Sequence, residues 1–558
     1  MLITLLVWLY LFAICLVYGN EVFKQILLIL GHDFLEKQTH IALRILLGMV
    51  FLAVVGMWLS LLLPLGGLVN LFIFLGFIFL LWRNWSSYRL LLIKPSISSF
   101  SRKKLGFYLV LLMVFAFALI SSTAKAINPD TLLYHIQTIR WVETYPAVPG
   151  LANLHSRLAF NSSWLLLNAL FSYSFLLGQS LHTLLGFLFF MCSWYFLDGF
   201  LEFSENKSIV GLFRLSLLPM AIYISKSELS SPGTDVPAIL FLWIGVALYW
   251  DSLSADRSFS NVYLALAVII SFFAVTVKLS VLPVLIIPIL ASLQNLANRR
   301  FWLILFFLTL FIFSPWLGRN AILSGYLVYP FPTLDVFSFD WKVPPSQVTE
   351  TRDGILAFAR MPGEPTEYVT NLPFSKWVGF WFANLSPFRR VVFVTSLLSP
   401  VIFGLRRFLK PMVNKDLQIL YVSIYFGLLY WFITAPAFRF GFGFISVVLL
   451  FILFMFFDIK SAGLGRLFSG AVLAFCLLYP TYLLGLSLPS QNIQERLFFP
   501  VQYESPETKA CYIDGKELNC AKIYGWCGYE SFPCALKIRM DLSLRGSDWD
   551  QGFRSTAP

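Results

Sequence analysis

The residues best suited to chemistry in this 558-residue chain lie in a short polar stretch that begins at Asn128. Asn128 is a favourable N-cap and Pro129 suits the first helical position, so the spacing predicts a helix that starts here. At roughly 100° per residue, its polar side chains, Asp130 included, share one face, and its leucines and isoleucines share the other. The polar face presents the Asp130 carboxylate to whatever reacts just above the lipid headgroups, with three of the five histidines in or beside this segment. We therefore take Asp130 and His135 as candidate catalytic residues, and Tyr134 as a candidate substrate contact.

A simpler explanation of Asp130 is that an acid in the first turn complements the helix dipole, which is worth about 0.3 to 1 kcal/mol. The surroundings favour chemistry, because His155 and His182 follow in the same region together with Arg140 and Arg157. No ligand-type spacing links the histidines, which argues against a metal site.

A second acidic site follows a later apolar run, at Lys226, Glu228 and Asp235. Asp235 could simply cap the next helix, since Pro237 fits its first turn. Lys226 and Glu228 have no such structural explanation at the edge of a membrane. Asp235 is therefore a candidate catalytic residue, and Lys226 a candidate phosphate contact.

Several cations stand in short connections between apolar runs. Lys278 lies in a very short connection, Arg319 and Tyr326 follow the run that ends at Trp316, and Arg439 lies in a tight turn. A charge so close to hydrocarbon usually faces a cavity or an anion, although a lysine can also extend to lipid phosphate. The planar guanidinium group suits phosphate oxygens. Together with Arg140 and Lys226, these residues predict a binding site for an anionic, lipid-linked substrate.

The composition shows which elements must position these residues. Hydrophobic residues make up 58% of the chain and charged residues only 13%, with 58 Phe and 17 Trp. Apolar runs of this kind match the thickness of a bilayer, so the chain is predicted to be an all-α polytopic membrane protein. The net charge of +12 is explained by basic loops between the runs, and not by nucleic-acid binding.

The apolar runs predict about fourteen transmembrane helices. The expected crossings are 2–19, 41–63, 68–82, 105–122, 182–200, 208–225, 236–251, 261–276, 279–295, 301–316, 391–405, 415–434, 439–457 and 467–486. Basic clusters at 83–104, 299–300 and 406–415 are expected to face the cytoplasm. This orientation places both termini and the segments 123–181, 317–390 and 487–558 outside, with the helix after Asn128 lying in the interface. Trp164 to Leu177 is then a re-entrant or interfacial helix.

The cysteines agree with this orientation. Four of the seven lie in the polar C-terminal tail, namely Cys511, Cys520, Cys527 and Cys534. Four thiols in so short a soluble segment predict two disulfides in an oxidising compartment, and the spacing does not resemble a zinc ribbon. The tail is therefore expected to be a small, disulfide-stapled extracytoplasmic unit.

These features resemble a known superfamily. An outer Asp130 on an interfacial helix, followed by many crossings and a small outer tail, is similar to the GT-C membrane glycosyltransferases. The resemblance implies three regions: N-terminal helices 1–104, a GT-C-like core 105–486, and the tail 487–558. Asp130 with Tyr134-His135, Arg319-Asn320 to Tyr329-Pro330, and Ala435-Pro436 with Arg439-Phe440 more closely resemble a family of bacterial polytopic membrane proteins described as hypothetical. In GT-C transferases of the protein mannosyltransferase type, the first outer Asp is often followed by Glu, whereas Thr131 follows Asp130 here.

The resemblance implies transfer of a sugar from a polyprenyl-phosphate carrier to an acceptor of the cell envelope, outside the bacterial inner membrane. Asp130 would orient or deprotonate the acceptor hydroxyl, and the cations would hold the leaving phosphate. Expected partners are the lipid-linked donor and membrane lipids, with no nucleic acid. No cofactor is expected, and a divalent metal ion is left open. The alternatives are a flippase for lipid-linked oligosaccharides and an O-antigen-type polymerase or ligase.

Overall fold

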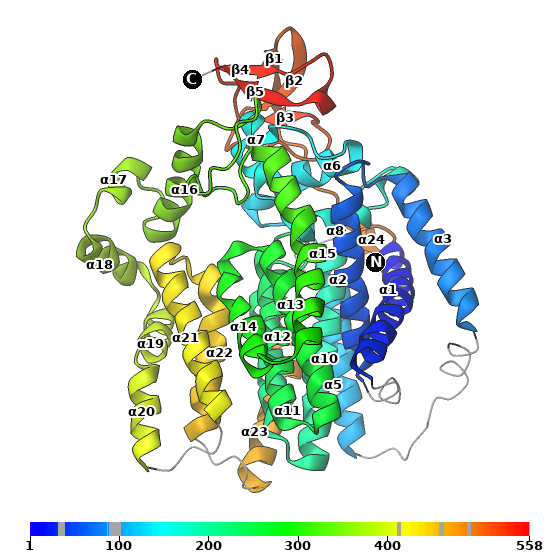
Figure 1. Cartoon of the computed structure of the whole chain (residues 1–558), viewed down its shortest axis with the longest axis vertical. Helices are drawn as coiled ribbons and strands as arrows, with labels where there is room; N and C mark the ends of the chain where they lie inside the picture. The colour runs from blue at the N-terminus through cyan, green and yellow to red at the C-terminus, as the bar shows by residue number, and fades with distance from the viewer. Residues whose placement is uncertain are drawn as a thin grey trace.

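The computed structural model describes residues 1–31, 39–85, 88, 102–409, 415–456, 462–487 and 493–556. Of the basic residues expected to face the cytoplasm, Arg89, Lys94 and Lys410 lie outside the described residues. Helices dominate the structure, and a small unit of β-strands lies at one end of the molecule (Figure 1).

Nine helices in the described part of the chain are long and apolar enough to cross a membrane. This length follows from their composition, because a predominantly apolar run of roughly 20 residues forms a helix that matches the thickness of a bilayer, even where a proline lies inside it. The nine helices are α1 (Leu2–Leu30), α2 (Ile41–Leu59), α5 (Arg102–Ser122), α10 (Leu184–Asn206), α12 (Asp235–Ser254), α13 (Arg257–Val277), α15 (Arg299–Ser324), α21 (Lys415–Thr434) and α23 (Ala462–Ser487).

The other five expected crossings also lie on helices, but these are short or broken. One pair of helices is bent by 48° and passes the same test only if it is counted as one span. That pair is α19 (Pro387–Leu397) with α20 (Ser399–Leu409). The shorter apolar helices are α3 (Gly67–Arg83), α11 (Ile209–Ser225), η4 (Leu279–Leu285) with α14 (Ile286–Gln294), and α22 (Phe438–Phe456).

The spans pack mainly with their neighbours in sequence. The most extensive contacts join α12 to α13, α1 to α2, and α10 to α11. Glycine allows the closest of these approaches, because a Cβ atom at Gly19 of α1 would overlap the carbonyl oxygen of Arg44 in α2. Figure 1 shows α1 to α3 on one side of the molecule and α19 to α22 on the other, with α10 to α13 between them.

Short helices fill the expected outer segments. They are the π-helical turn η2 (Thr131–His135), α6 (Ile136–Thr144), α7 (Leu151–Leu154), η3 (Ser156–Ala159), α8 (Ser163–Leu170), α9 (Ser174–Leu177), α16 (Pro345–Arg360), α17 (Thr366–Thr370), α18 (Phe374–Asn384) and α24 (Ile493–Arg496). The stretch from Trp164 to Leu177 is split into α8 and α9, and each is too short to cross a bilayer. All eight residues of α8 are buried.

The helix after Asn128 differs from the expected interfacial helix. A π-helical turn inserts one extra residue per turn, so η2 shifts the phase between Asp130 and the residues of α6. Gln137 and Trp141 are buried like Ile136 and Ile139. Both faces therefore contact protein, and the amphipathic pattern reflects two protein neighbours of different polarity instead of lipid and water.

The C-terminal tail corrects the all-α expectation, because it is built from short strands. These are β1 (Thr508–Ile513), β2 (Lys516–Ala521), β3 (Cys534–Ala535), β4 (Leu542–Leu544) and β5 (Phe553–Ser555), with the 3₁₀ turn η5 (Trp549–Gln551). The strand order is β1-β2-β3 in one sheet, with β1 antiparallel and β3 parallel to β2, and β4 pairs with β5 in another. Disulfides join Cys511 to Cys520 and Cys527 to Cys534, which confirms the two predicted bridges.

A group of charged residues lies near the ends of α10, α11 and α12, at the end of α12 that is opposite Asp235. Arg214 forms ion pairs with Glu202 and, at 4.0 Å, with Asp251, which also accepts a hydrogen bond from the hydroxyl of Tyr195 at 2.8 Å. Asp251 is sixteen residues beyond Asp235 on the same helix. At 1.5 Å per residue this separation is about 24 Å, so this group is distinct from the site described next.

Candidate functional site

Five charged side chains from separate parts of the chain meet at the end of the helices nearest the tail. Arg439 donates to Asp130 at 3.0 Å, and its Nε lies 3.6 Å from a carboxylate oxygen of Asp235. Arg157 lies 3.4 Å from the other oxygen of Asp130, and Lys278 forms an ion pair with Asp235. We call Asp130, Arg157, Asp235, Lys278 and Arg439 the charged cluster.

Helix ends position the members of this cluster. The side chain of Asn128 accepts a hydrogen bond from the backbone N–H of Asp130 at 2.9 Å, which confirms the predicted cap. Asp235 is the first residue of α12, and Lys278 directly follows α13, where the backbone becomes extended. Arg439 is the second residue of α22. Because α12 and α13 are antiparallel neighbours with extensive contacts, the start of α12 and the end of α13 lie at the same end of the helix pair.

The carboxylates of the cluster are more covered than its cations. The side chains of Asp130 and Asp235 are each 19% exposed, whereas Arg157 is 41%, Arg439 40% and Lys278 24% exposed. The formal charge of the cluster is +1. The accessible part of the site is therefore cationic, and it favours an anion at its open side.

Aromatic rings surround the cations. The ammonium group of Lys278 lies 4.3 Å from the ring centre of Phe440, and the guanidinium group of Arg439 lies 5.0 Å from the same ring. Phe358 of α16 approaches Arg439 at 5.8 Å and is half exposed. A cationic group beside exposed apolar surface suits an anion that carries a hydrocarbon chain.

Tyr134 and His135 lie beneath the cluster and are buried. Their rings are 4.3 Å apart, edge to face. Burial lowers the pKa of His135 to about 4 despite the nearby carboxylates, so the imidazole is neutral at neutral pH. Burial also raises the pKa of Tyr134, with a further contribution from Asp130. Nδ1 of His135 has no hydrogen-bond partner among the described residues.

Two predicted phosphate contacts lie away from the cluster. The guanidinium group of Arg140 lies 4.4 Å from the ring centre of Tyr529 and 5.4 Å from that of Phe532, both in the tail. Lys226 is exposed and lies over the ring of Tyr223 at 4.8 Å. Each of these cations contacts an aromatic ring of the protein, and in the described part of the chain neither forms an ion pair with Asp130 or Asp235.

Arg319 and Tyr326, also predicted as substrate contacts, are buried in the protein instead. Arg319 donates to the side chain of Asn161 at 3.1 Å and to the hydroxyl of Ser60 at 2.8 Å. The hydroxyl of Tyr326 donates to the carbonyl of Val343 at 3.0 Å. Both side chains form hydrogen bonds within the protein, and neither contacts a member of the charged cluster in the described part of the chain.

Arg157 belongs to the cluster but was not among the candidates chosen from sequence. In the sequence, Arg157 stands out only as a basic residue near the segment that carries Asp130. Its position depends on His155, whose Nδ1 accepts a hydrogen bond from the backbone N–H of Arg157 at 3.1 Å and so caps η3. The spacing His-x-Arg is too common for this cap to be recognised without the structure.

The tail braces the segment that carries Asp130. Gln137 donates to the carbonyls of Gly528 at 2.7 Å and Ser531 at 2.9 Å, and the N–H of Cys527 donates to the carbonyl of Leu132 at 3.1 Å. A Cβ atom at Gly150, where φ is +65°, would overlap the carbonyl oxygen of Phe553. Figure 1 shows the strands directly above α6 and α7.

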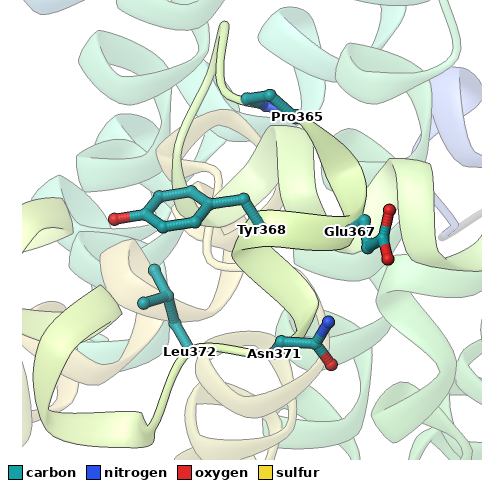
Figure 2. Close-up of a pocket in the computed structure, with 5 residues that line it drawn as sticks. All are labelled: Pro365, Glu367, Tyr368, Asn371 and Leu372. Carbon is teal, nitrogen blue, oxygen red and sulfur yellow. The ribbon is translucent and has the colours of Figure 1, made fainter.

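Metal ligands and surface hollows offer no second candidate site in the part of the chain that the structure describes. In the described ranges, no group of three or more His, Cys, Asp or Glu side chains is arranged to hold a metal ion. A shallow, open hollow beside α17, shown in Figure 2, is lined by Pro365, Glu367, Tyr368, Asn371 and Leu372. None of these residues belongs to the charged cluster, and no reactive pair lies among them.

Comparison with known proteins places the chain in a family without assigning it an activity. Residues 1–446 match the family described as a domain of unknown function (DUF8201). The match covers well over half of the chain, so the chain belongs to this family. It includes every member of the charged cluster and ends before the tail. No curated protein and no solved structure shows a significant match.

Proposed function

We propose that this member of the DUF8201 family is a membrane glycosyltransferase of the GT-C type, which transfers a sugar from a polyprenyl-phosphate carrier to a hydroxyl group of a cell-envelope acceptor. The observation that carries the proposal is the charged cluster. In it, two largely covered carboxylates form ion pairs with three cations, and each cation is more exposed than the carboxylates. About fourteen crossings, counting the short and broken helices as spans, belong to the same proposal.

In this reaction, the hydroxyl oxygen of the acceptor attacks the anomeric carbon of the donor sugar. The bond between that carbon and the phosphate oxygen breaks, and its electrons leave with the polyprenyl phosphate. Arg439, Arg157 and Lys278 stabilise the charge that grows on the leaving phosphate, because they are fixed by carboxylates before the reaction begins. Asp130 orients the acceptor hydroxyl or takes its proton.

The apolar surroundings of the cluster support a lipid-linked donor. Phe358 and Phe440 border the guanidinium group of Arg439. A phosphate at Arg439 would therefore have its hydrocarbon chain next to rings and apolar helices. A soluble sugar phosphate has no hydrocarbon chain to bury against this apolar surface.

The disulfides support the extracytoplasmic placement of the site, and a bacterial plasma membrane is part of the same proposal. They lie in the tail, which binds directly to the segment bearing Asp130. Disulfides persist in oxidising compartments outside the cytoplasm, so the charged cluster would face the same side.

The test is transfer of radiolabelled sugar by the purified protein, from a panel of polyprenyl-phosphate sugars, compared with an Asp130→Asn variant. We expect wild type to turn over at least one donor and the variant to lose transfer, because the variant leaves Arg157 and Arg439 without their carboxylate partner. Lys226→Gln is the matched control, since Lys226 lies outside the cluster. Full transfer by Asp130→Asn, or no transfer by wild type from any donor, would refute the proposal.

A flippase for lipid-linked oligosaccharides is the second candidate, favoured by the group of charged residues near the ends of α10, α11 and α12. Arg214 and Asp251 are buried and Glu202 is partly exposed, and charged residues in membrane helices often line substrate or ion pathways in transporters. Mass spectrometry of the copurified lipid, followed by reconstitution, separates the two. A flippase would move the intact lipid-linked sugar across the vesicle membrane and release no free polyprenyl phosphate, whereas a transferase would release it.

A further inference from the structure

A third carboxylate lies beside the charged cluster and is held differently from the other two. Glu228 is in the loop between α11 and α12, and its Oε2 accepts a hydrogen bond from the side-chain amide of Asn128 at 2.8 Å. The same Asn128 caps Asp130 through its oxygen. One amide side chain therefore bridges Glu228 and the backbone of Asp130.

The loop that carries Glu228 is fixed to the site. The hydroxyls of Thr131 in η2 and Ser231 are 2.6 Å apart, and the carbonyl of Ser230 accepts a hydrogen bond from the hydroxyl of Tyr503 at 3.2 Å. Glu228 is half-buried. These contacts from η2 and the tail hold its carboxylate in a defined place.

The three carboxylates differ in their cationic contacts. Asp130 is in contact with Arg157 and Arg439, and Asp235 with Lys278 and Arg439. Within the described part of the chain, no Lys or Arg side chain forms an ion pair with Glu228, whose side-chain partner is a neutral amide. Although burial opposes them, Lys278 and Arg439 lower the pKa of Asp235, whereas no ion pair among the described residues holds the Glu228 carboxylate in its charged form.

We infer that Glu228, and not Asp130, is the general base that removes the proton from the acceptor hydroxyl, while Asp130 and Asp235 position the cations that hold the phosphate. This assignment rests on the proposed transfer reaction. The acceptor proton goes to the Glu228 carboxylate as the new carbon–oxygen bond forms and the bond to the phosphate oxygen breaks. Water then takes the proton from the neutral carboxyl group, and no oxidant or reductant is needed.

The electrostatic surroundings suit this role. Burial is the main cause that raises the pKa of Glu228; the hydrogen bond from Asn128 opposes it, and the negative charge of Asp235 adds to it. Of the other charged groups that face Glu228, Arg439 from α22 lowers its pKa and Asp130 raises it. A general base is most effective when its pKa approaches the working pH, so the upward direction favours Glu228.

The test compares Glu228→Gln and Glu228→Asp with wild type, using the labelled donor that wild type turns over. We expect Glu228→Gln to lower kcat by 100-fold or more and to leave the donor KM within about threefold, because a general base contributes roughly 10²- to 10⁴-fold. Wild-type kcat should rise with pH as Glu228 loses its proton, and the residual rate of Glu228→Gln should lack this rise. Glu228→Asp should restore part of the rate. Glu205→Gln, an exposed glutamate outside the cluster, is the matched control.

The outcomes separate this inference from the proposal on which it rests. If Glu228→Gln keeps wild-type kcat and its pH dependence while Asp130→Asn is inactive, Glu228 is not the base and the transferase proposal stands. If Glu228→Gln is inactive and Glu228→Asp recovers nothing, with unfolding temperatures unchanged, the carboxylate has no role that a shorter acid can fill and the inference is overturned. If wild type turns over no donor, the proposed function itself fails.

Discussion

Replacement of Arg439 by Ala should weaken the binding of a lipid phosphate and destabilise the fold only modestly. Arg439 is the one cluster residue that contacts both carboxylates, at 3.0 Å from Asp130 and 3.6 Å from Asp235. Its side chain is 40% exposed, so solvent screens both pairs, and each contributes only about 0.2 to 1 kcal/mol to stability. Loss of both pairs should therefore cost no more than about 2 kcal/mol.

The expected effect on binding is larger. A hydrogen bond between a guanidinium group and a phosphate is worth about 1.5 to 3 kcal/mol. Since each 1.4 kcal/mol changes the dissociation constant tenfold, the variant should bind lipid phosphate about 10 to 100 times more weakly. Lys278 would retain its ion pair with Asp235, so the affinity should fall without vanishing.

Farnesyl phosphate is a suitable probe, because it carries the phosphate and a short prenyl chain without any sugar. Its affinity can be measured by calorimetry on the protein in nanodiscs, with farnesol as the uncharged comparison. The matched control is Arg389→Ala. Arg389 lies over the ring of Phe438, which directly precedes Arg439 in the sequence. In the part of the chain that the structure describes, Arg389 forms no ion pair with the cluster carboxylates. The reasoning is refuted if Arg439→Ala binds farnesyl phosphate as tightly as wild type, or if Arg389→Ala loses affinity equally.

Two further predictions concern buried residues near the site. Arg319→Ala should lower the free energy of unfolding by about 3 kcal/mol, because Ser60 and Asn161 lose their buried partner. The folded variant should keep its affinity for farnesyl phosphate. Thermal unfolding measures the first effect, and calorimetry measures the second. The neutral form of His135 should stabilise the fold above its ordinary pKa of 6.5, and this contribution should be lost as the pH falls towards about 4. The difference between the unfolding temperatures at pH 7 and pH 5 should therefore be smaller in His135→Gln than in wild type. An equal difference in the two proteins would contradict the neutral state of His135 in the folded protein.

Hydropathy predicted where the helices lie, because apolar runs have few ways to satisfy their backbone other than helix. It could not predict that α14 and α20 are preceded by breaks, since those depend on local geometry and packing. The β-strands of the tail were also missed, because their short polar segments have no clear alternation of apolar residues.

The residues of the site divide in the same way. Asp130, Asp235, Lys278 and Arg439 were chosen because they stand at helix ends on one expected rim, and the structure brings these four together. Arg319 met the same criterion but lies inside the protein, where Asn161 and Ser60 satisfy it. A linear sequence does not reveal which cation finds a buried partner more than a hundred residues away.

The C-terminal tail lies outside the matched family region but contacts the segment that carries the site. The matched region stops at residue 446, yet Leu132 and Gln137 bind Cys527, Gly528 and Ser531, and α23 packs on α5 and α11. A shortened chain that ended at the boundary would retain all five charged residues of the site and lose the contacts that fix the backbone around them. The unit defined by sequence similarity is therefore smaller than the unit that must fold, and an engineered exchange between relatives would have to move the C-terminal strands together with the surface around Gly150.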